Sequence, residues 1–123
     1  MESARTNRPD SLTSWGLRGR IYITYILSCA SIWDPEKSER NLVDRGFDFT
    51  FASVIFTGPT LERIDTRQDY GEVRRITLGI ADGIPLTVVY TDRAEAGEVV
   101  RRIISARVSN RRERQAYRKV FPS

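Results

Sequence analysis

The stretch VRRITLGIADGIPLTVVY, residues 73–90, decides the fold of this chain because it has the pattern of a β-hairpin. Apolar and β-branched residues dominate both sides of Asp82-Gly83, a dipeptide that is favoured in two-residue hairpin turns. The pattern predicts one strand over Val73–Ile80 and a second over Ile84–Thr91. The centre of the chain is therefore expected to form antiparallel β-structure.

Further strand signals flank this hairpin. Leu61–Asp65 is a weaker candidate strand before it, and Val99–Arg107 is a candidate strand after it. Residues 92–98 (DRAEAGE) are polar and contain Gly97, which predicts a longer loop. Consecutive strands on short connections favour antiparallel pairing. We therefore expect an antiparallel sheet of about four strands in an α+β domain.

Two helices are expected before the sheet, after a short strand that ends near Trp33. Asp34 is a favourable N-cap, Pro35 suits the first helical position, and Gly46 suits the position that ends a helix. A second short helix is expected over Thr50–Thr57, where apolar residues lie on one face and a Gly-Pro pair follows.

The chain has 123 residues, the size of one ordinary domain, which we place at residues 30–123. Residues 1–29 are expected to be a disordered or non-essential extension, although residues 20–28 could form an extra strand. The longest apolar stretch, Ile21–Leu27, is far shorter than the roughly 20 residues that a membrane-spanning helix needs. Cys29 is the only cysteine, which fits a reducing, cytoplasmic compartment. No membrane association is expected.

Positive charge is concentrated at the C-terminus. The chain carries a net charge of +4, whereas residues 101–123 contain eight basic side chains and one acidic one, so this segment carries 8 − 1 = +7. Seven of the eight are arginines, whose planar guanidinium suits phosphate oxygens. The segment could be a polyanion-binding surface or an ordinary solvated helix face. The candidate RNA-binding residues are Arg102, Arg111, Arg112, Arg114 and Arg118.

The last element is expected to be a basic helix from about Arg111 to Phe121. Asn110 and Glu113 have the spacing of a capping box, with Asn in place of Ser or Thr. Ala116, Tyr117, Val120 and Phe121 make an apolar stripe along the same segment. The stripe is expected to pack on the core or to contact a partner.

Residue types limit the chemistry that is open to this chain. It contains no histidine, the commonest general base and metal ligand, and no cysteine cluster. Metal-free RNA cleavage needs a base for the 2′-hydroxyl, an acid for the leaving 5′-oxygen and cations around the phosphate. By type, the residues that could move protons or stabilise charge are Asp69, Tyr70, Glu72, Arg74, Arg107 and Lys37. No metal or other cofactor is expected.

Arg74 occupies an unusual position in its predicted strand. Strict alternation places it on the same face as Ile76 and Leu78. An arginine on an apolar face is costly unless it lies in a cleft or pairs with an acid. Glu72 shares that face and is the nearest candidate. Arg74 is therefore expected to be either a functional cation or one half of an ion pair at the rim of the sheet.

The predicted strand Val99–Arg107 also has two different faces. One face, which includes Arg102, Ile104 and Ala106, is the more core-like. Ser105 and Arg107 then share the more polar face, which is expected to lie near Thr91. A sheet face with Arg, Ser and Thr beside an arginine-rich helix could cradle phosphates or could simply be solvated.

Four stretches between residues 32 and 120, taken in order, carry a family likeness. They are Trp33-Asp34-Pro35-x-Lys37 with Asn41, Gly46-Phe47-x-Phe49, Asp65-x-Arg67-x-Asp69-Tyr70-Gly71-Glu72-x-Arg74 with Gly79, and Arg102–Arg107 with Arg111–Arg114 and Tyr117. With these motifs the chain resembles the BrnT family of type II toxins. The resemblance implies a compact RelE-like α+β fold and endoribonuclease activity. It also implies neutralisation by a BrnA-type antitoxin, through which the complex would bind operator DNA.

The resemblance also implies roles for individual residues. Positions of the family motifs are occupied by Lys37, Glu72, Arg74, Thr91 and Arg107. Arg74 and Arg107 are expected to act as phosphate-stabilising cations, and Glu72 and Tyr70 as groups that transfer protons. A non-enzymatic nucleic-acid-binding module, a degenerate toxin and a protein that only docks an acidic partner are the alternatives to a ribonuclease.

Overall fold

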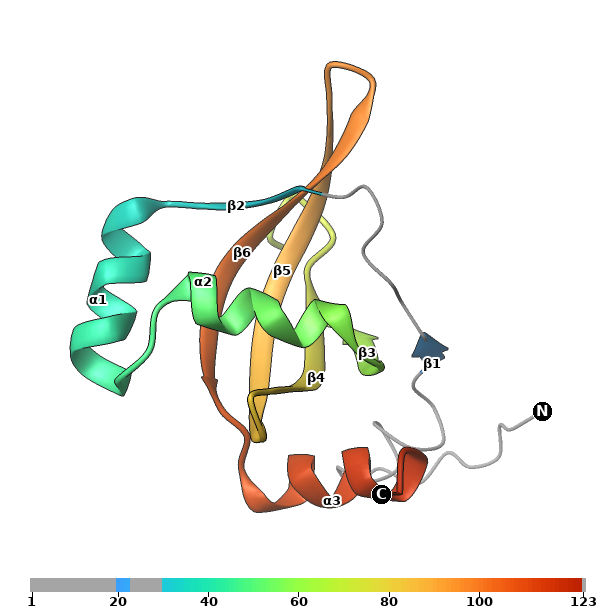
Figure 1. Cartoon of the computed structure of the whole chain (residues 1–123). Coiled ribbons are helices and arrows are strands. Elements are labelled where there is room, and N and C mark those ends of the chain that lie inside the picture. Colours follow the sequence, from blue (N-terminus) through green and yellow to red (C-terminus); the bar gives the residue numbers. More distant parts are fainter. Residues whose placement is uncertain (1–19, 23–29, 123) are drawn as a thin grey trace.

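The computed structural model describes residues 20–22 and 30–122, which form a mixed β-sheet with helices on both faces (Figure 1). In chain order the elements are β1 (Arg20–Tyr22), β2 (Ala30–Trp33), α1 (Pro35–Arg45), α2 (Phe49–Ala52), the 3-10 helix η3 (Ser53–Thr57), β3 (Thr60–Ile64), β4 (Arg75–Ala81), β5 (Ile84–Glu95), β6 (Glu98–Val108) and α3 (Arg111–Val120). The predicted extension apart from residues 20–22 lies outside the described residues.

The helix α1 begins and ends where its capping residues predict. The backbone N–H of Glu36 donates to the Asp34 side chain at 3.0 Å, and Pro35 occupies the first turn. Gly46 follows in the left-handed region, with φ of 89°. The second predicted helix is also present, as α2 followed directly by η3. Local signals are sufficient here because caps and glycine act within a few residues.

The strand order is β1-β3-β4-β5-β6-β2. The strands β3 to β6 pair antiparallel with their neighbours, as predicted. The expectation of an antiparallel sheet of about four strands is nevertheless wrong, because β2 adds parallel to β6 and β1 adds antiparallel to β3. Five of the described strands lie within residues 30–108. Almost all of the other elements separate β2 from β6 along the chain, so no local pattern specifies their pairing.

The prediction of a longer loop over residues 92–98 is also wrong. The strands β5 and β6 continue until only Ala96 and Gly97 separate them, with φ of 53° and 81°. Two consecutive residues with positive φ suit the twist of a tight hairpin. The hairpin projects beyond the rest of the sheet in Figure 1, and most of its residues are exposed. It therefore needs no apolar alternation, which is why its sequence resembles a loop.

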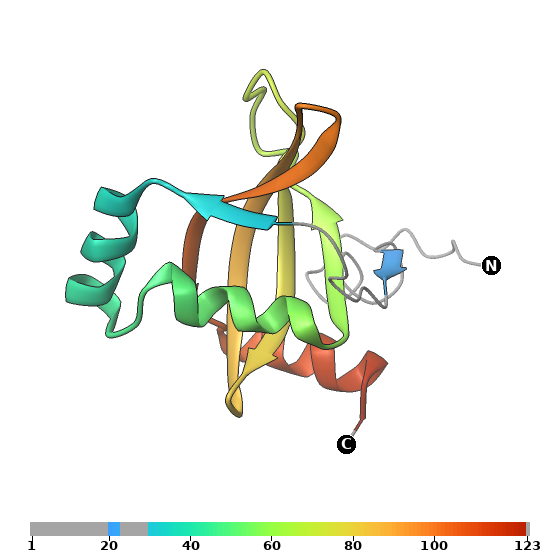
Figure 2. The ribbon, with the colours of Figure 1, turned by 45° about the horizontal axis from the view of Figure 1, so that its top comes forward.

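Helices cover both faces of the sheet, and we name each face after the helix that packs on it. On the η3 face, α2 and η3 pack against the centre of the sheet through Phe49, Ile55 and Phe56. On the α3 face, Ala116 packs against Leu61, Ile76 and Leu78, which confirms the predicted core contact of the apolar stripe. Figure 2 shows α2 and η3 in front of the strands and α3 behind their lower ends.

Gly79 allows η3 to approach β4 closely. A Cβ atom at this position would lie 2.7 Å from the Cβ of Ile55, which is closer than non-bonded carbon atoms approach one another in proteins. Both Ile55 and the neighbouring Phe56 are fully buried. The η3 face is therefore tightly packed where η3 crosses β4.

Candidate functional site

A β-bulge in β6 decides which side chains lie on the α3 face. Between Ile103 and Ser105 the register with β5 shifts by one residue, so Ile104 is the extra residue. A regular strand would place Arg102 and Ser105 on opposite faces. Because paired residues of antiparallel strands point to the same side, the bulge brings Arg102, Ser105 and Arg107 together on the α3 face.

This arrangement corrects one expectation from the sequence. Strict alternation groups Arg102 with Ile104 and Ala106 on a core-like face. Instead, Ala106 lies in the core of the η3 face, whereas Arg102 pairs with Thr91 and lies on the opposite side. The grouping is wrong because strict alternation ignores bulges. The polar row on β6 therefore contains Arg102, whereas Arg101, which strict alternation groups with Ser105 and Arg107, lies on the η3 face.

Arg107 forms a bidentate ion pair with Glu113 at the start of α3. Its two terminal nitrogens lie 2.7 and 2.8 Å from the two Glu113 carboxylate oxygens. Glu113 also accepts hydrogen bonds from the Thr87 hydroxyl at 2.9 Å and from the Asn110 backbone N–H at 2.8 Å, which completes the predicted capping box. The sequence suggests Glu113 only as a capping residue.

These contacts determine the charge of the Glu113 carboxylate. Burial raises the pKa of Glu113, but the hydrogen bonds from Arg107, Asn110 and Thr87 outweigh it and leave the pKa lowered. Glu113 is therefore an anion at neutral pH. The Arg107 side chain is 43% exposed, and a guanidinium has five N–H donors, so the carboxylate leaves donors that can meet a phosphate.

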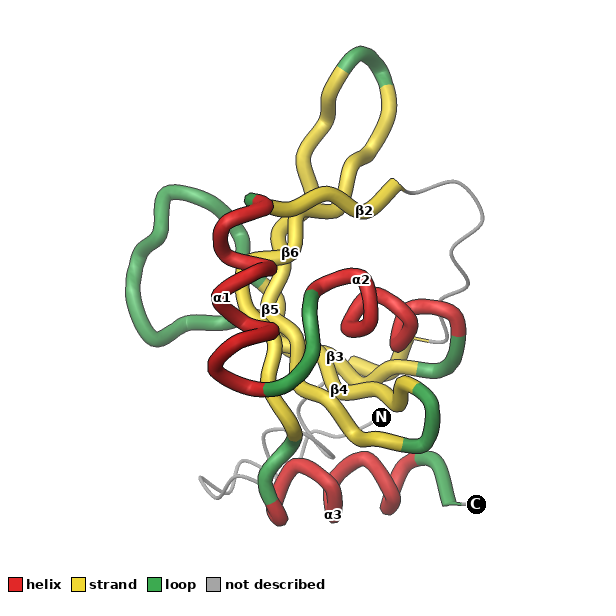
Figure 3. Tube along the Cα trace, turned by 60° about the vertical axis from the view of Figure 1, so that its left-hand side comes forward, coloured by secondary structure: helices red, strands yellow, loops and turns green. Residues whose placement is uncertain are grey.

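The loop between β3 and β4, residues 65–74, overhangs the α3 face. Figure 3 shows it leaving the sheet on the side away from α2 and η3. The buried Asp65 carboxylate accepts side-chain hydrogen bonds from Arg67 at 2.8 and 2.7 Å and one from the Tyr70 hydroxyl at 3.1 Å. Hydrogen bonding by Arg67 is the main reason that the pKa of Asp65 is lowered to about 2. Asp65 thus holds the loop together as a permanent anion.

Arg74 lies at the base of the same loop and pairs with Glu72. Its Nε donates to a Glu72 oxygen at 2.9 Å, which confirms the ion-pair alternative from the sequence. The guanidinium also lies 4.2 Å above the centre of the Tyr70 ring. The hydrogen bond from Arg74 lowers the pKa of Glu72, and Arg93 lies 3.6 Å from the same carboxylate. The predicted residues Tyr70 and Glu72 therefore both contact Arg74.

Thr91 contacts the end of the loop that carries Arg74. It is buried, and its hydroxyl donates to the Val73 carbonyl oxygen at 2.7 Å. This bond attaches β5 to the end of the loop that carries Arg74. Thr91 can therefore position the loop.

The structure separates the two arginines that the sequence proposes as catalytic. Arg107 pairs with Thr87, whereas the loop of Arg74 is attached to Thr91. Thr87 and Thr91 are four residues apart on β5, about 13 Å at roughly 3.3 Å per residue. Because Arg102 pairs with Thr91 at one end and Ser105 pairs with Val89 between the ends, the groups form one extended polar row on the α3 face.

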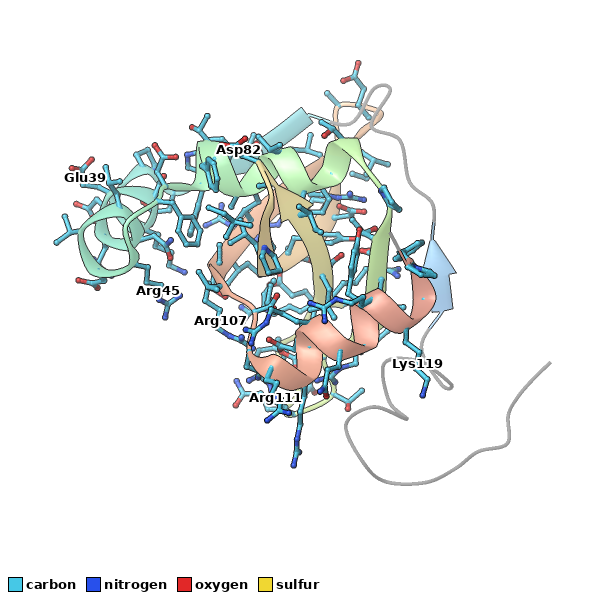
Figure 4. The ribbon with its side chains drawn as sticks, turned by 60° about the horizontal axis from the view of Figure 1, so that its bottom comes forward. Glu39, Arg45, Asp82, Arg107, Arg111 and Lys119 are labelled. Carbon is cyan, nitrogen blue, oxygen red and sulfur yellow. The ribbon has the colours of Figure 1, made fainter. Side chains whose placement is uncertain are left out.

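Lys37 lies apart from both groups, on α1. It is exposed and lines a cleft of about 190 Å³ between α1 and β6, together with Arg40, Asn41 and Ser105. Ser105 is thus the residue that links this cleft to the polar row. Figure 4 shows Arg45, Arg107 and Arg111 following one another from the end of α1 to the start of α3.

The arginines of α3 have different surroundings. Arg111 and Arg112 are exposed in the first turn of the helix. Arg114 is half-buried and donates to the Ser109 carbonyl oxygen at 2.8 Å, and Arg118 is exposed in the last turn. The basic helix is therefore present as predicted, but its arginines do not form a single cluster.

A second polar group lies on the η3 face, and the sequence does not single it out. The Tyr90 hydroxyl donates to the buried carboxylate of Glu62, and the Arg101 guanidinium lies 4.1 Å above the Tyr90 ring. Arg101 also pairs with Asp92 at 2.9 Å. Burial raises the pKa values of Glu62 and Tyr90. Glu62 lies inside a predicted strand, between Leu61 and Arg63, and a carboxylate in a strand is the one signal that could have indicated it.

A small α+β domain with arginines, hydroxyls and a tyrosine on one sheet face has the chemistry of a polyanion-binding protein, and RNA phosphates suit that face. The family model described as "ribonuclease toxin, BrnT, of type II toxin-antitoxin system" matches residues 33–113, which is about two thirds of the chain. The chain therefore belongs to the BrnT family, whose members are ribonuclease toxins that pair with an antitoxin.

A comparison with curated proteins found no match to this chain. Within residues 20–22 and 30–122, no helix is long and apolar enough to cross a membrane. The same part of the chain contains no group of three or more Cys, Asp or Glu side chains that could hold a metal ion.

Proposed function

We propose that this protein is a metal-independent endoribonuclease toxin of the cytoplasm, with a RelE-like fold and a BrnA-type antitoxin that carries the operator-DNA contacts of the complex. RNA binds along the polar row of the α3 face. The observation that carries this proposal is the bulge at Ile104, which places Arg102, Ser105 and Arg107 on one face beside the arginine-rich start of α3. Membership of a ribonuclease toxin family supports the reaction type.

Arg102 and Arg107 hold the phosphates of the bound strand in this scheme. Arg107 is already oriented by Glu113 and retains N–H donors for a phosphate oxygen. A guanidinium that is fixed before the substrate arrives loses little entropy on binding. Lys37 meets a neighbouring phosphate from the α1 cleft, which Ser105 joins to the polar row. Arg111 and Arg112 add phosphate contacts at the end of this surface.

Tyr70, Glu72 and Arg74 carry the chemical step. Glu72 has a lowered pKa and is an anion at neutral pH, so it accepts the proton of the ribose 2′-hydroxyl. The 2′-oxygen then attacks phosphorus, and the bond from phosphorus to the 5′-oxygen breaks. Tyr70 gives its proton to the leaving 5′-oxygen, and Arg74, 4.2 Å from its ring, stabilises the resulting negative charge. The products are a 2′,3′-cyclic phosphate and a 5′-hydroxyl.

Cleavage of a labelled single-stranded RNA by the purified protein in EDTA tests the site. We expect Arg107→Ala and Arg74→Ala each to lower the cleavage rate by about 100-fold, the typical effect of removing one charge-stabilising donor. Lys119→Ala is the matched control, because this cation is exposed in the last turn of α3, at the other end of the helix from Arg107, and it should change the rate by less than about twofold. Full activity of folded Arg107→Ala or Arg74→Ala would remove that residue from the site.

Inducible expression tests the biological role. We expect growth arrest with RNA breakdown, and rescue of both by the product of the adjacent reading frame. Normal growth with intact RNA, despite abundant folded protein, would contradict the toxin assignment.

A non-enzymatic RNA-binding module or degenerate toxin is the second candidate. One observation favours it. Arg74 and Arg107 are both paired with carboxylates, so neither ion pair as a whole carries a net positive charge. This function predicts RNA binding that weakens steeply with salt but no cleavage by the unmodified protein.

A further inference from the structure

The helix α3 presents two different sides beside the sheet. Its sheet-facing residues include Glu113 and Ala116, which are buried. At 100° per residue, Arg114 and Arg118 lie on one flank of this buried stripe, and Lys119 lies on the other. The flank with Arg114 and Arg118 faces the hairpin of β4 and β5, because both residues line a groove with residues of that hairpin.

The groove has a volume of about 240 Å³ and lies between α3 and the β4–β5 hairpin. The hairpin contributes Ile80 and Pro85, and the helix contributes Tyr117 and Phe121. Ile80 is a large apolar residue near the turn end of β4, and it is 44% exposed. Such a concave apolar surface is typical of a site that receives a partner's side chains.

The charged side chains that line the groove are both basic. Arg114 and Arg118 line it, and none of its described lining residues is acidic. Within α3 there are five basic residues and one acid, and that acid, Glu113, is already paired with Arg107. The complementary ligand therefore combines apolar side chains with carboxylates.

A protein segment fits this groove better than RNA does. Single-stranded RNA is bound mainly by bases that stack on open aromatic faces. Here the rings of Tyr117 and Phe121 pack on each other, with centres 4.9 Å apart, and the Tyr117 hydroxyl donates to the Pro59 carbonyl oxygen. Tyr117 is thus held in place as part of the wall of the groove.

We propose that this groove binds an acidic, amphipathic segment of the antitoxin, with its apolar side chains against Ile80 and Phe121 and its carboxylates on Arg114 and Arg118. The proposal rests on the proposed function only in requiring an antitoxin. The groove flanks α3 on the hairpin side, whereas Arg102 and Ser105 lie on the sheet away from that hairpin. The antitoxin and RNA therefore use separate residues.

Calorimetric titration of the full chain with the purified product of the adjacent reading frame tests this surface. We expect Arg118→Glu and Ile80→Ser each to weaken binding at least tenfold, because one reverses a charge at the groove and the other removes an apolar contact. Lys119→Glu makes the same charge change on the other flank and should alter Kd by less than twofold. Circular dichroism of each variant shows whether it is folded.

A set of outcomes separates this proposal from the ribonuclease assignment. Arg102→Ala should lose RNA cleavage but keep its affinity for the adjacent gene product. If the unmodified protein binds this product through the groove but cleaves no RNA, the ribonuclease assignment fails and the docking site stands. Unchanged Kd values for Arg118→Glu and Ile80→Ser, an equal loss in Lys119→Glu, or no binding by the unmodified protein would each overturn the docking site. Weakened RNA binding by Arg118→Glu at unchanged antitoxin affinity would make the groove an RNA surface instead.

Discussion

A buried glutamate lies on each side of the sheet, Glu113 in α3 on the α3 face and Glu62 in β3 on the η3 face, and their surroundings move their pKa values in opposite directions. At Glu113, burial raises the pKa, but hydrogen bonds led by the one from Arg107 outweigh it. At Glu62, burial outweighs the hydrogen bond from Tyr90 and the charge of Arg101. The comparison shows that burial alone does not determine the charge of a carboxylate. The face with the fixed anion is the one on which a bidentate ion pair orients Arg107.

Removing Glu113 should have the largest effect on stability. Glu113→Ala deprives Thr87 and the Asn110 N–H of their acceptor and breaks the ion pair with Arg107. We expect the free energy of unfolding in urea to fall by about 2–3 kcal/mol, because buried polar groups lose their partners while the exposed part of Arg107 is resolvated. Glu98→Ala, at an exposed glutamate in β6, is the control and should stay within about 0.5 kcal/mol. A loss at Glu113 no larger than this control would mean that the network contributes little.

The tight packing of the η3 face can be tested at Gly79. Gly79→Ala adds a Cβ atom against Ile55, and we expect it to lower the free energy of unfolding by about 2 kcal/mol through overpacking. Gly58→Ala is the matched control, because a Cβ atom there would meet nothing within 4 Å and the φ of Gly58 is −132°. Denaturant midpoints and slopes measure both. Equal stability of the two variants would show that η3 moves away from β4 without cost.

The pH dependence of stability should differ between the two glutamates, and this is the smallest of the expected effects. Glu113, with a lowered pKa, stabilises the fold above the ordinary glutamate pKa of 4.5, and this contribution is lost as pH falls through its folded pKa. Glu62, with a raised pKa, contributes fully below 4.5, and its contribution is lost as pH rises through its folded pKa. Glu62→Gln keeps a neutral hydrogen-bonding group for Tyr90 and should match or exceed the parent by up to about 1 kcal/mol at pH 8.

Thermal unfolding of Glu62→Gln and the parent between pH 4 and pH 8 provides the measurement. The parent should lose stability relative to the variant as pH rises. A variant that is less stable than the parent at pH 8 would show that the ionised carboxylate is favourable there, with Arg101 and Arg75 as its partners, and would reverse the assigned direction of the pKa.

Local signals predict much of the fold. The helix α1 follows from Asp34, Pro35 and Gly46, and the central hairpin follows from Asp82-Gly83. Because these signals act between residues that are close in sequence, they can be recognised in a single sequence. The pairing of β2 with β6 and the network at Glu62 depend on strand register, which is set by contacts between distant segments. The sequence alone therefore does not predict them.

The candidate site likewise contains some contacts that the sequence predicts and others that it does not. The contact between Glu72 and Arg74 joins residues two apart, and the sequence predicts it as an alternative. The pair of Arg107 and Glu113 joins a strand to a helix, and the sequence offers only the capping function of Glu113. The membership of Arg102 in the polar row depends on the bulge, for which a run of alternating residues gives no signal.

The bulge at Ile104 has a consequence for how the length of β6 can change. In the register with β5, Ile103 lies opposite Tyr90 and Ser105 lies opposite Val89, so Ile104 is the residue between them that the pairing skips. Deleting Ile104 would therefore leave a regular strand in which Arg102 and Ser105 still share one face and Ala106 still points to the other. An additional inserted residue could not be accommodated in the same way, because Ile104 already occupies the unpaired position of the bulge. The gene could thus lose one codon here and keep the inside and outside of the sheet, whereas the gain of one codon would exchange charged and apolar side chains between surface and core.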